Sequence, residues 1–259
     1  MTILRTAPPA LGIRAVIFDR DGVLTHFDFA PVRALLGDLH FPLSEARERW
    51  HGFCARNPPP SSEEAERRLL AGFWGEVADH LGLGSDWRAR FAAFDYTSTL
   101  RPFADARPAL TAVRRRGLHV GVLSNFPMAS LRASLATVGL LDLVDVAAAA
   151  PVIGAAKPAP EAYLHVLEAL GVAPHECVLV DDEAPCVAGA RALGIHAYLL
   201  DRRPGGDGER ERGTVSTLDA LVAEIDSLRI STSPSPGGVA GGPLEFPQST
   251  KSVPRQEEA

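Results

Sequence analysis

The sequence predicts an α/β fold in which a mainly parallel sheet is interrupted, after its first strand, by a long helical insertion. Three observations predict it. Short β-rich runs alternate with helical patterns that end at glycine, which is typical of βαβ units. Residues 27–98 break this rhythm with helical spacing throughout. Acidic residues follow two of the apolar runs directly, at the strand ends where open parallel sheets bind ligands.

The first apolar run, RAVIF at 14–18, predicts the first buried strand. Three further runs, LHVGVL at 118–123, CVLV at 177–180 and HAYLL at 196–200, predict strands of the same sheet. All four are largely apolar without a regular polar alternation, as expected of strands that helices cover on both faces.

Helical patterns fill the intervals between these runs. We predict helices at 105–116, 127–138, 160–170 and 184–193, each followed directly by a glycine, and a last helix at 217–228. Proline near the start of a helix and glycine just past its end is the expected asymmetry. Strands joined by such helices form right-handed βαβ units.

The insertion at 27–98 is expected to fold as a separate helical lobe. The core would then consist of residues 1–26 and 99–230, while residues 231–259, rich in Pro, Gly and Ser, are predicted to be disordered. Aromatic residues at helical spacing usually pack inward, so those of the insertion are expected to form its own small core. They are Trp50, Phe53, Phe73, Trp74, Trp87 and Phe91.

Composition restricts the class of partner. The chain has 259 residues, 46% of them hydrophobic and 22% charged, which is the balance of an ordinary globular protein. Its apolar runs fall short of the roughly 18 residues that cross a bilayer. A net charge of −6 gives no support for nucleic acid as the main partner. We therefore expect neither a membrane nor a nucleic acid as partner.

The cysteines and the N-terminus indicate the cytoplasm. Cys54, Cys177 and Cys186 are odd in number and widely spaced, which fits reduced thiols better than a disulfide framework or a zinc site. The first residues lack the charged leader, long apolar centre and cleavage site of a signal peptide.

Polar and charged residues stand where the predicted strands end. Because parallel strands of one sheet share an edge, these residues are expected to converge there. Asp19, Arg20, Asp21 and Gly22 follow the first strand, Ser124 and Asn125 the second, and Asp181 and Asp182 the third, and Lys157 lies in the connection before the third.

Lysine is rare in this chain. Lys157 and Lys251 are the two lysines in a total of 26 lysines and arginines, and Lys251 lies in the predicted tail. The folded part is therefore expected to hold one lysine, a compact point charge that the planar guanidinium of arginine does not replace. Chance in an arginine-biased composition is the alternative explanation.

The acidic residues predict a metal site. Several carboxylates brought together repel one another and raise one another's pKa unless a cation neutralises them. Oxygen ligands suit a hard divalent ion, and Mg²⁺ suits sites that combine a few carboxylates with a substrate phosphate. Asp19, Asp21, Asp181 and Asp182 are therefore the candidate ligands of Mg²⁺.

The same residues suit phosphoryl transfer. An aspartate such as Asp19 can attack phosphorus and form an aspartyl-phosphate, which divides one difficult step into two. Asp21 is placed to act as general acid toward the leaving oxygen and then as base for water. Gly22 would let the backbone turn closely around the phosphate and offer N–H groups to it. Ser124 and Lys157 would hold the phosphoryl group.

Each of these features alone has an ordinary explanation. Acidic turns after strands are common, and Ser124, Asp181 or Asp182 could simply cap the helices that follow. The glycine spacing after Asp19 does not fit a helix–loop–helix calcium loop. The sequence has neither a GxxxxGK[ST] phosphate loop, which disfavours a nucleotide-driven kinase, nor a GxSxG elbow. It is the combination, in this order, that indicates a site.

Four ordered motifs resemble those of the haloacid dehalogenase (HAD) superfamily, in the phosphatase branch whose helical cap is inserted after the first strand. They are VIFDRDGVL (16–24), VLSN (122–125), AAKPAPEAY (155–163) and VLVDDE (178–183), and the resemblance covers residues 13–228. It implies a Rossmann-like core, dependence on Mg²⁺, and small phosphorylated substrates admitted by opening of the cap.

By motif match, the resemblance implies that Asp19 is the nucleophile and Asp21 the acid/base, with the backbone carbonyl of Asp21 also on the metal. Asp182 is the expected direct metal ligand of the second acidic cluster, with Asp181 as its close partner. The candidate phosphate-binding residues are Arg20, Gly22, Ser124, Asn125 and Lys157.

Two residues depart from the pattern of the family. Arg20 stands where capped relatives more often carry an apolar residue, so its side chain is expected to make an unusual contact. Cys186 stands near a position where many relatives place Asn or Asp. The groups around the metal ligands are therefore expected to differ from those of the family. Neither change removes a residue that the mechanism needs.

The predicted reaction is the Mg²⁺-dependent hydrolysis of a small-molecule phosphomonoester. The founding dehalogenases of the superfamily also use an aspartate nucleophile but lack the second aspartate, so Asp21 favours phosphoryl transfer. A sugar phosphomutase keeps the same motifs and stays open as an alternative. A catalytically silent binding or regulatory protein is a third possibility, although the nucleophile and the lysine whose loss would mark it are both present.

Specificity is expected to come from the cap and its two linkers, near 25–28 and 98–101. A cap that covers the site favours a small phosphorylated metabolite as partner, because closure must exclude water around the reacting phosphate. Candidate substrate contacts are His26, Arg47, His51 and Arg56, although solvated helix faces account for most such residues.

Overall fold

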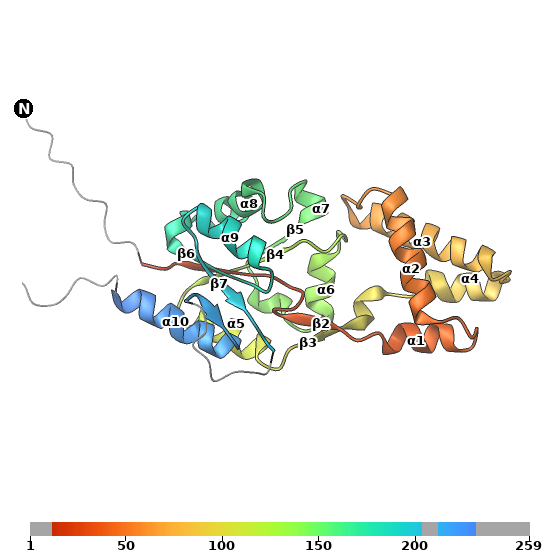
Figure 1. Ribbon diagram of the computed structural model, residues 1–259, viewed down its shortest axis with the longest axis horizontal. Coiled ribbons are helices and arrows are strands. Elements are labelled where there is room, and N and C mark those ends of the chain that lie inside the picture. The colour runs from red at the N-terminus through yellow and green to blue at the C-terminus, as the bar shows by residue number, and fades with distance from the viewer. Residues whose placement is uncertain (1–11, 204–211, 232–259) are drawn as a thin grey trace, which may run out of the picture.

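The computed structural model describes residues 12–203 and 212–231 (Figure 1). Of the predicted disordered tail, 231–259, Ser231 is instead the last residue of a helix, and the rest lies outside the described residues. An α/β core and a smaller helical cap lie end to end. No helix in the two described ranges is long and apolar enough to cross a membrane. The predicted α/β class, with a parallel sheet and an inserted helical lobe, is confirmed.

The core is built on six parallel strands in the order β5-β4-β1-β6-β7-β8. All four predicted strands are present, and β1 lies between β4 and β6. The sequence does not predict β5 and β8, because VAAA has little strand propensity and β8 has only 2 residues. The strands are β1 (Ala15–Phe18), β4 (His119–Ser124), β5 (Val146–Ala149), β6 (Cys177–Asp181), β7 (His196–Leu200) and β8 (Thr214–Val215).

Helices cover both faces of the sheet, as the continuous apolar strands predict. One face carries α5 (Ala106–Arg115), α6 (Leu131–Thr137) and α10 (Leu218–Ser231), and the other carries α7 (Ala150–Ile153), α8 (Pro160–Leu170) and α9 (Ala184–Ala192). Short 3₁₀ helices occupy Leu141–Leu143 and Pro174–Glu176.

Helix α6 starts later than the predicted 127–138. Its N-cap residue is Ser130, and both the backbone N–H and the hydroxyl of Ser130 donate hydrogen bonds to Glu66 of the cap, at 2.8 and 2.6 Å. A contact with a residue so distant in the chain therefore marks the helix start, and the local sequence does not reveal it.

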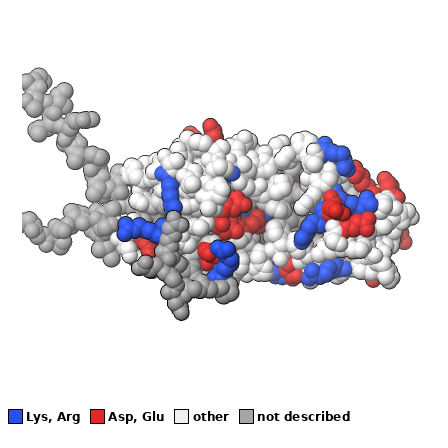
Figure 2. Space-filling view, viewed as in Figure 1, with Lys and Arg blue, Asp and Glu red and all other residues white. Residues whose placement is uncertain are grey.

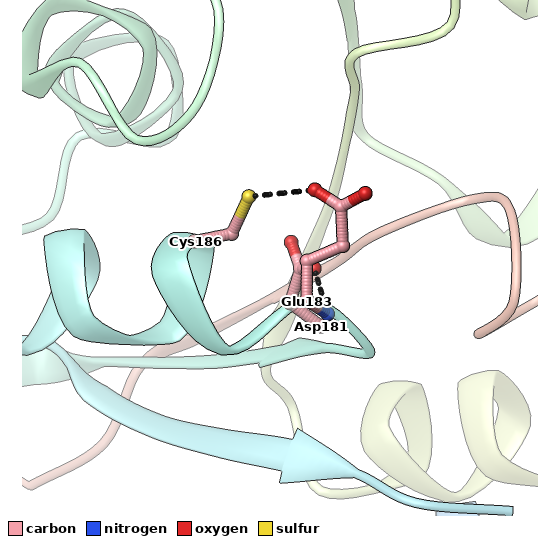
Figure 3. A group of neighbouring side chains, drawn as sticks. All are labelled: Asp181, Glu183 and Cys186. Carbon is pink, nitrogen blue, oxygen red and sulfur yellow. Dashed lines mark hydrogen bonds between the residues drawn. The ribbon is translucent and has the colours of Figure 1, made fainter.

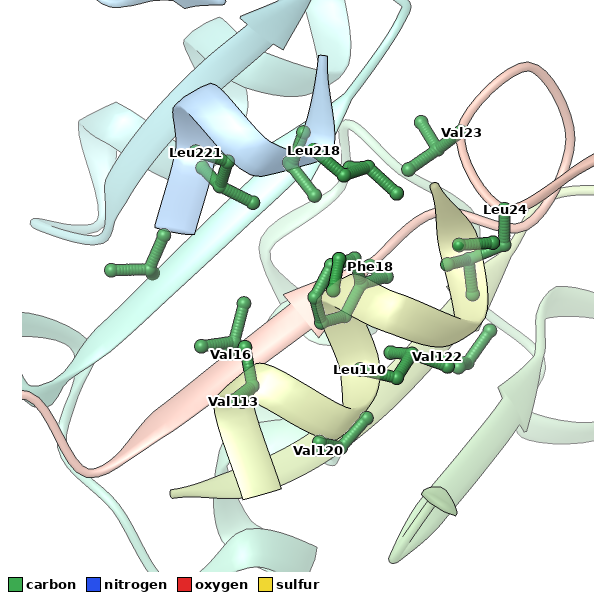
Figure 4. Close-up of a cluster of buried hydrophobic side chains, with 14 of the residues drawn as sticks. Val16, Phe18, Val23, Leu24, Leu110, Val113, Val120, Val122, Leu218 and Leu221 are labelled. Atoms are coloured by element: carbon green, nitrogen blue, oxygen red, sulfur yellow. The ribbon is translucent and has the colours of Figure 1, made fainter. Parts of the chain in front are cut away.

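The strand β1 divides its side chains between the two faces. Val16 and Phe18 pack with α5 and α10 (Figure 4). Ala15 and Ile17 pack with α8 and α9 on the other face. All four are fully buried. Burial of one large aliphatic or aromatic side chain contributes about 1.5–3 kcal/mol, so β1 is held firmly from both sides. The loop that follows β1 starts from this fixed point.

The cap contains α1 (Ala30–Gly37), α2 (Leu43–Arg56), α3 (Glu63–His80) and α4 (Ser85–Ala92), all within the predicted insertion. The six predicted aromatic residues belong to its core cluster, with Trp50 and Trp87 partly buried at its border. The ring centroids of Trp74 and Phe91 lie 4.7 Å apart. The predicted small core of the insertion is confirmed.

Two short strands join the cap to the core. β2 (Thr25–Phe27) and β3 (Leu100–Pro102) form an antiparallel ribbon, preceded on the return by a 3₁₀ turn at Tyr96–Thr99. The two linkers that the sequence indicates near 25–28 and 98–101 therefore pair with each other. The chain leaves and re-enters the core at one place, directly beside the end of β1.

Candidate active site

A buried lysine stands between two carboxylates at the carboxyl ends of β1 and β6. Lys157 Nζ lies 2.5 Å from Asp19 Oδ1 and 2.6 Å from Asp181 Oδ2. The three residues are 5%, 8% and 1% exposed, respectively. Asp19 and Asp181 are more than 100 positions apart in the chain, and they meet because β1 and β6 are neighbours in the sheet. The predicted convergence at this edge is what the structure shows for these three residues.

The backbone of Lys157 is held by the side chain of Asn125, which follows β4. The Asn125 amide nitrogen donates to the Lys157 carbonyl at 2.8 Å, and the Lys157 N–H donates to the Asn125 amide oxygen at 2.9 Å. This reciprocal pair fixes the loop that carries the lysine. Asn125 thereby positions Lys157, while its predicted contact with phosphate stays a prediction.

The pKa values of both Asp19 and Lys157 are raised, for different reasons. Burial raises the pKa of the Asp19 carboxyl to about 7; the neighbouring Lys157 opposes the shift and the Asp181 carboxylate adds to it. Burial alone would lower the pKa of Lys157, but Asp19 and Asp181 together raise it above its ordinary value. The lysine therefore stays protonated, and one ammonium group faces two carboxyl groups.

These residues open into a cavity of about 330 Å³, here called the acidic pocket. Figure 2 shows acidic side chains gathered near the middle of the molecule, on the core side of its junction with the cap. The lining residues are Asp19, Asp21, Gly22, Asn125, Phe126, Lys157, Asp181, Asp182 and Glu183. Oxygen atoms of carboxylates dominate the polar groups of this lining, which suits a hard cation.

Arg20 does not line the acidic pocket. Its side chain is 1% exposed, and its guanidinium donates to the Asp21 carboxylate at 2.7 and 3.1 Å and to Ser134 Oγ at 3.1 Å. The guanidinium carbon also lies 4.6 Å from the centre of the Phe126 ring. The expectation that Arg20 contacts phosphate therefore needs correction: its donors are turned to Asp21 and Ser134, which explains the unusual residue at this position.

Gly22 has a backbone that only glycine adopts readily. Its φ is +77°, and a Cβ placed there would come within 2.0 Å of Asp182 Oδ2. The Gly22 N–H donates to the Thr25 carbonyl at 2.8 Å, so it is already used inside the turn instead of being offered to a phosphate. The glycine thus lets the loop after β1 lie directly against the loop after β6.

Ser124 lies beneath the acidic pocket and not in its lining. The residue is 2% exposed, and its hydroxyl oxygen accepts a hydrogen bond from the Phe126 N–H at 3.1 Å. It therefore shapes the turn after β4. Its predicted hydrogen bond to a phosphoryl group stays a prediction.

Three groups beside the pocket form a chain of hydrogen bonds (Figure 3). The Glu183 N–H donates to Asp181 Oδ1 at 2.9 Å, and the Cys186 thiol donates to Glu183 Oε2 at 3.3 Å. Burial and the charges of Asp181 and Glu183 raise the pKa of Cys186 to about 12, so the thiol keeps its proton. A carboxylate oxygen of Asp181, one of Glu183 and the Sγ of Cys186 all lie within 4.8 Å of one another.

Two residues of the site are not among the predicted ones. Glu183 directly follows the acidic pair at the end of β6, so its position in the sequence could have indicated it. Phe126 offers no such signal, because an aromatic residue two positions after a strand is common in any loop. The structure adds it by placing its ring against the guanidinium of Arg20.

Comparisons with known proteins agree with this geometry. Residues 13–194 match a family model described as haloacid dehalogenase-like hydrolase. The phosphatase MT3486 of Mycobacterium tuberculosis is 42% identical over 221 residues, which cover 83% of this chain and 98% of that protein. A phosphoglycolate phosphatase of Rhodospirillum rubrum is 26% identical over 242 residues, 87% of this chain and 93% of that protein.

Solved structures share the fold. A HAD phosphatase from Thermococcus onnurineus superposes with a TM-score of 0.54 at 27% identity, over 84% of this chain and 100% of that one. An L-2-haloacid dehalogenase from Xanthobacter autotrophicus gives a TM-score of 0.57 at 23% identity, over 83% of this chain and 99% of that one. The latter similarity concerns the fold alone.

Proposed function

Because the chain belongs to the haloacid dehalogenase-like hydrolases, as its four motifs indicated, we propose that it is a phosphatase that hydrolyses a small phosphomonoester through a phosphorylated Asp19, with Mg²⁺ as cofactor. The observation that carries the proposal is the buried Lys157 between Asp19 and Asp181, at the bottom of a pocket that Asp21 also lines. The proposed nucleophile Asp19, the ammonium group of Lys157 and the carboxyl group of Asp21 thus lie close together.

The first half of the reaction forms a covalent intermediate. A carboxylate oxygen of Asp19 attacks phosphorus, and the bond between phosphorus and the ester oxygen breaks. The carboxyl group of Asp21 gives its proton to the departing oxygen, which leaves as an alcohol. Lys157 offsets the negative charge that spreads over the phosphoryl oxygens and favours the ionised form of Asp19, against the effect of burial.

The second half returns the enzyme to its starting state. The carboxylate of Asp21 takes a proton from a water molecule as the water oxygen attacks phosphorus. The bond from phosphorus to Asp19 then breaks, which releases inorganic phosphate and restores both carboxyl groups to their original protonation. The Arg20 guanidinium and the Thr25 hydroxyl, 3.4 Å from Asp21 Oδ1, hold the acid/base carboxylate beside the pocket throughout.

The residues of the acidic pocket fit a divalent cation. The carboxylates lie close enough to repel one another: burial and the charge of Asp181 raise the pKa of Asp182 and add to the raised pKa of Asp19. Both Asp181 oxygens already accept hydrogen bonds, from Lys157 and from the Glu183 N–H, which favours Asp182 as the direct ligand. Asp19, Asp182 and the Asp21 carbonyl would hold Mg²⁺, which when bound stabilises charge on the transferring phosphoryl group.

The proposed partner is a small phosphorylated metabolite, and we propose the cytoplasm as the location. The acidic pocket has a volume of about 330 Å³, which suits a small ester and not a duplex or a folded protein. Cys54, Cys177 and Cys186 are all free thiols, which supports a reducing compartment. A silent binding protein is less well supported, since each residue that the reaction needs is kept.

The proposal is tested by phosphate release from a panel of small phosphate esters, with and without Mg²⁺. The wild type should turn over at least one ester with Mg²⁺ and lose this turnover when the metal is chelated. Asp19→Asn should abolish it, whereas Asp219→Asn, an equal change on the exposed start of α10, should leave it intact. Undiminished release by Asp19→Asn would overturn the proposal.

A further inference from the structure

A second cavity, here called the cap cavity, adjoins the acidic pocket. It has a volume of about 260 Å³, and its lining residues come from the cap, the ribbon that joins cap and core, and the loop after β4. Phe27, Phe29, Trp50, Leu70, Tyr96 and Phe126 are among its walls.

Phe126 connects the two cavities because it lines both of them. Its ring centroid lies 5.2 Å from that of Phe27 and 5.8 Å from that of Tyr96, so it forms one wall of the cap cavity. A phosphoryl group in the acidic pocket would therefore carry its ester group past Phe126 and into the cap cavity.

The lining of the cap cavity is mainly apolar, and its two hydroxyl groups are already engaged. The Tyr96 hydroxyl shares a hydrogen bond with Ser130 Oγ at 2.9 Å, and the Thr99 hydroxyl donates to the Tyr96 carbonyl at 2.6 Å. Arg47 and His51, both exposed, supply the charged or ionisable nitrogen groups, and within the described residues no carboxylate lines this cavity. Away from Arg47 and His51, hydroxyl groups of a sugar or polyol would lose water here without gaining partners.

Packing of the cap does not by itself explain these walls. Phe29, Leu43 and Leu70 line the cavity and are partly exposed, yet none of them belongs to the aromatic core cluster of the cap. They present apolar surface to a space that continues into the catalytic pocket. A ligand that fills this space would remove that surface from water.

We propose that the substrate is the phosphomonoester of an apolar alcohol, with an aromatic or branched alkyl group that fills the cap cavity. This inference rests on the proposed phosphatase function and specifies its substrate class. An apolar cavity of roughly 150 Å³ already admits a benzene ring, so the cap cavity has room for a ring with substituents. Sugar phosphates, and with them a sugar phosphomutase, are less well suited to this mainly apolar lining.

The direct test compares benzyl phosphate with glycerol 1-phosphate, both esters of primary alcohols. We expect kcat/KM to favour benzyl phosphate by about 100-fold, because a single methylene in an apolar pocket can already be worth about tenfold. Equal turnover or a preference for the glycerol ester would overturn the substrate class while leaving the phosphatase function in place.

Binding separates this inference from the proposed function. Benzylphosphonate and methylphosphonate, which cannot be hydrolysed, are titrated against the Mg²⁺-loaded enzyme and followed by tryptophan fluorescence, since Trp50 and Trp74 line the cap cavity. Tighter binding of the benzyl compound supports the apolar site even if no ester is hydrolysed. Absence of hydrolysis would contradict only the phosphatase function. Equal affinities would overturn the inference.

A variant places the effect in the cap cavity. Leu70→Asn, on α3, should lower kcat/KM about tenfold more for benzyl phosphate than for glycerol 1-phosphate. Leu43→Asn, on α2, provides a second variant if the first does not fold. Leu164→Asn on α8 is the matched control, since its side chain is 47% exposed outside the cavity lining. An equal loss for both esters would contradict the inference.

Discussion

At the scale of single residues, the site depends on side chains whose partners lie far away in the chain. The order of strands and acidic residues was enough to predict that Asp19, Lys157 and Asp181 meet. The contact of Arg20 with Ser134 could not be predicted, because it spans 114 positions and depends on how α6 packs. The sequence showed only that Arg20 was an unusual residue at its position.

Arg20 acts as a positioning residue for Asp21. Arg20→Met should lower kcat by about 10- to 100-fold, because a catalytic group displaced by an ångström loses that much, and KM should change little. Steady-state kinetics with the preferred ester measures the two constants separately, and Arg20→Lys should recover part of kcat. A rise in KM at unchanged kcat would show instead that Arg20 binds the substrate.

Gly22 allows the loops after β1 and β6 to touch. Gly22→Ala should raise the Mg²⁺ concentration needed for half-maximal activity by about 10- to 100-fold, because its Cβ would displace Asp182. Gly117→Ala is the matched control: Gly117 has a similar φ of +72°, but open space surrounds its Cβ position. If both variants had the same effect on Mg²⁺ dependence, backbone strain and not the displaced carboxylate would be the cause.

At the scale of secondary structure, the sequence predicts elements that are strongly patterned and misses those that tertiary contacts create. Strands such as VIF or CVLV carry their own signal. β5, made of valine and alanines, acquires its strand form from pairing with β4. The pairing of β2 with β3 needs both linkers to return to one point, which no local pattern shows.

One contact of this kind links cap and core. Glu66 on α3 is 5% exposed and accepts two hydrogen bonds from Ser130, the N-cap residue of α6. Glu66→Gln loses the charge and one acceptor, so the cap should open more often. Limited proteolysis with a protease of broad specificity should then cut faster near 25–28 and 98–101.

Glu64→Gln is the control for this prediction. Glu64 lies on the same helix, but its side chain is 68% exposed and pairs with Arg68 at the surface, where ion pairs contribute little. Its cleavage rate should match the wild type. Equal rates in Glu66→Gln and the wild type would mean that the Ser130 contact does not restrain the cap. Mg²⁺ with a phosphate analogue should slow cleavage at both linkers in the wild type.

At the scale of the whole molecule, Arg202 ties the catalytic loop to the starts of α5 and α10. Its guanidinium donates to the Gly22 and Val23 carbonyls at 3.2 and 2.7 Å and to both oxygens of Asp105. Asp105 also accepts from the N–H of Leu218 at the start of α10. Arg202 is 180 positions from Gly22 and 97 from Asp105 in the chain, and no sequence pattern indicates that they make contact.

This link predicts a pH dependence of stability. Burial alone would raise the pKa of Asp105, but the hydrogen bonds from Arg202 and Leu218 and the charge of Arg202 lower it below its ordinary value. The folded pKa is then below the unfolded one of about 3.9. The link therefore stabilises the fold above that pH and is lost as the pH falls through the folded pKa.

Urea unfolding at two pH values measures the effect. Asp105→Asn should reduce the free energy of unfolding by about 1–3 kcal/mol at pH 7, the usual worth of hydrogen bonds to a charged group. At a pH below the folded pKa of Asp105, the wild type should lose this advantage and the two proteins should unfold alike. A difference that stays constant with pH would mean that the Asp105 charge is not the stabilising feature.

The cap cavity also belongs to the scale of the whole molecule. Its walls come from the cap, the ribbon and the loop after β4, and Phe126 is far in the chain from the cap residues it faces. The sequence predicts the aromatic residues as core, which holds for most of them. It does not show that Trp50, Phe73 and Trp74 also border an open space, because that depends on how the cap sits on the core.

The central claim is that Asp19 carries the phosphoryl group. The measurement that tests it most directly is mass spectrometry of peptides from acid-quenched Asp21→Asn enzyme, mixed with Mg²⁺ and an aryl phosphate whose leaving group needs no proton. Since the variant cannot activate water, we expect the phosphorylated form of the peptide containing Asp19 to accumulate. In the double variant, which carries Asp19→Asn as well, this phosphorylated peptide should be absent. Release of the leaving group with Asp19 unmodified at every quench time would contradict the account.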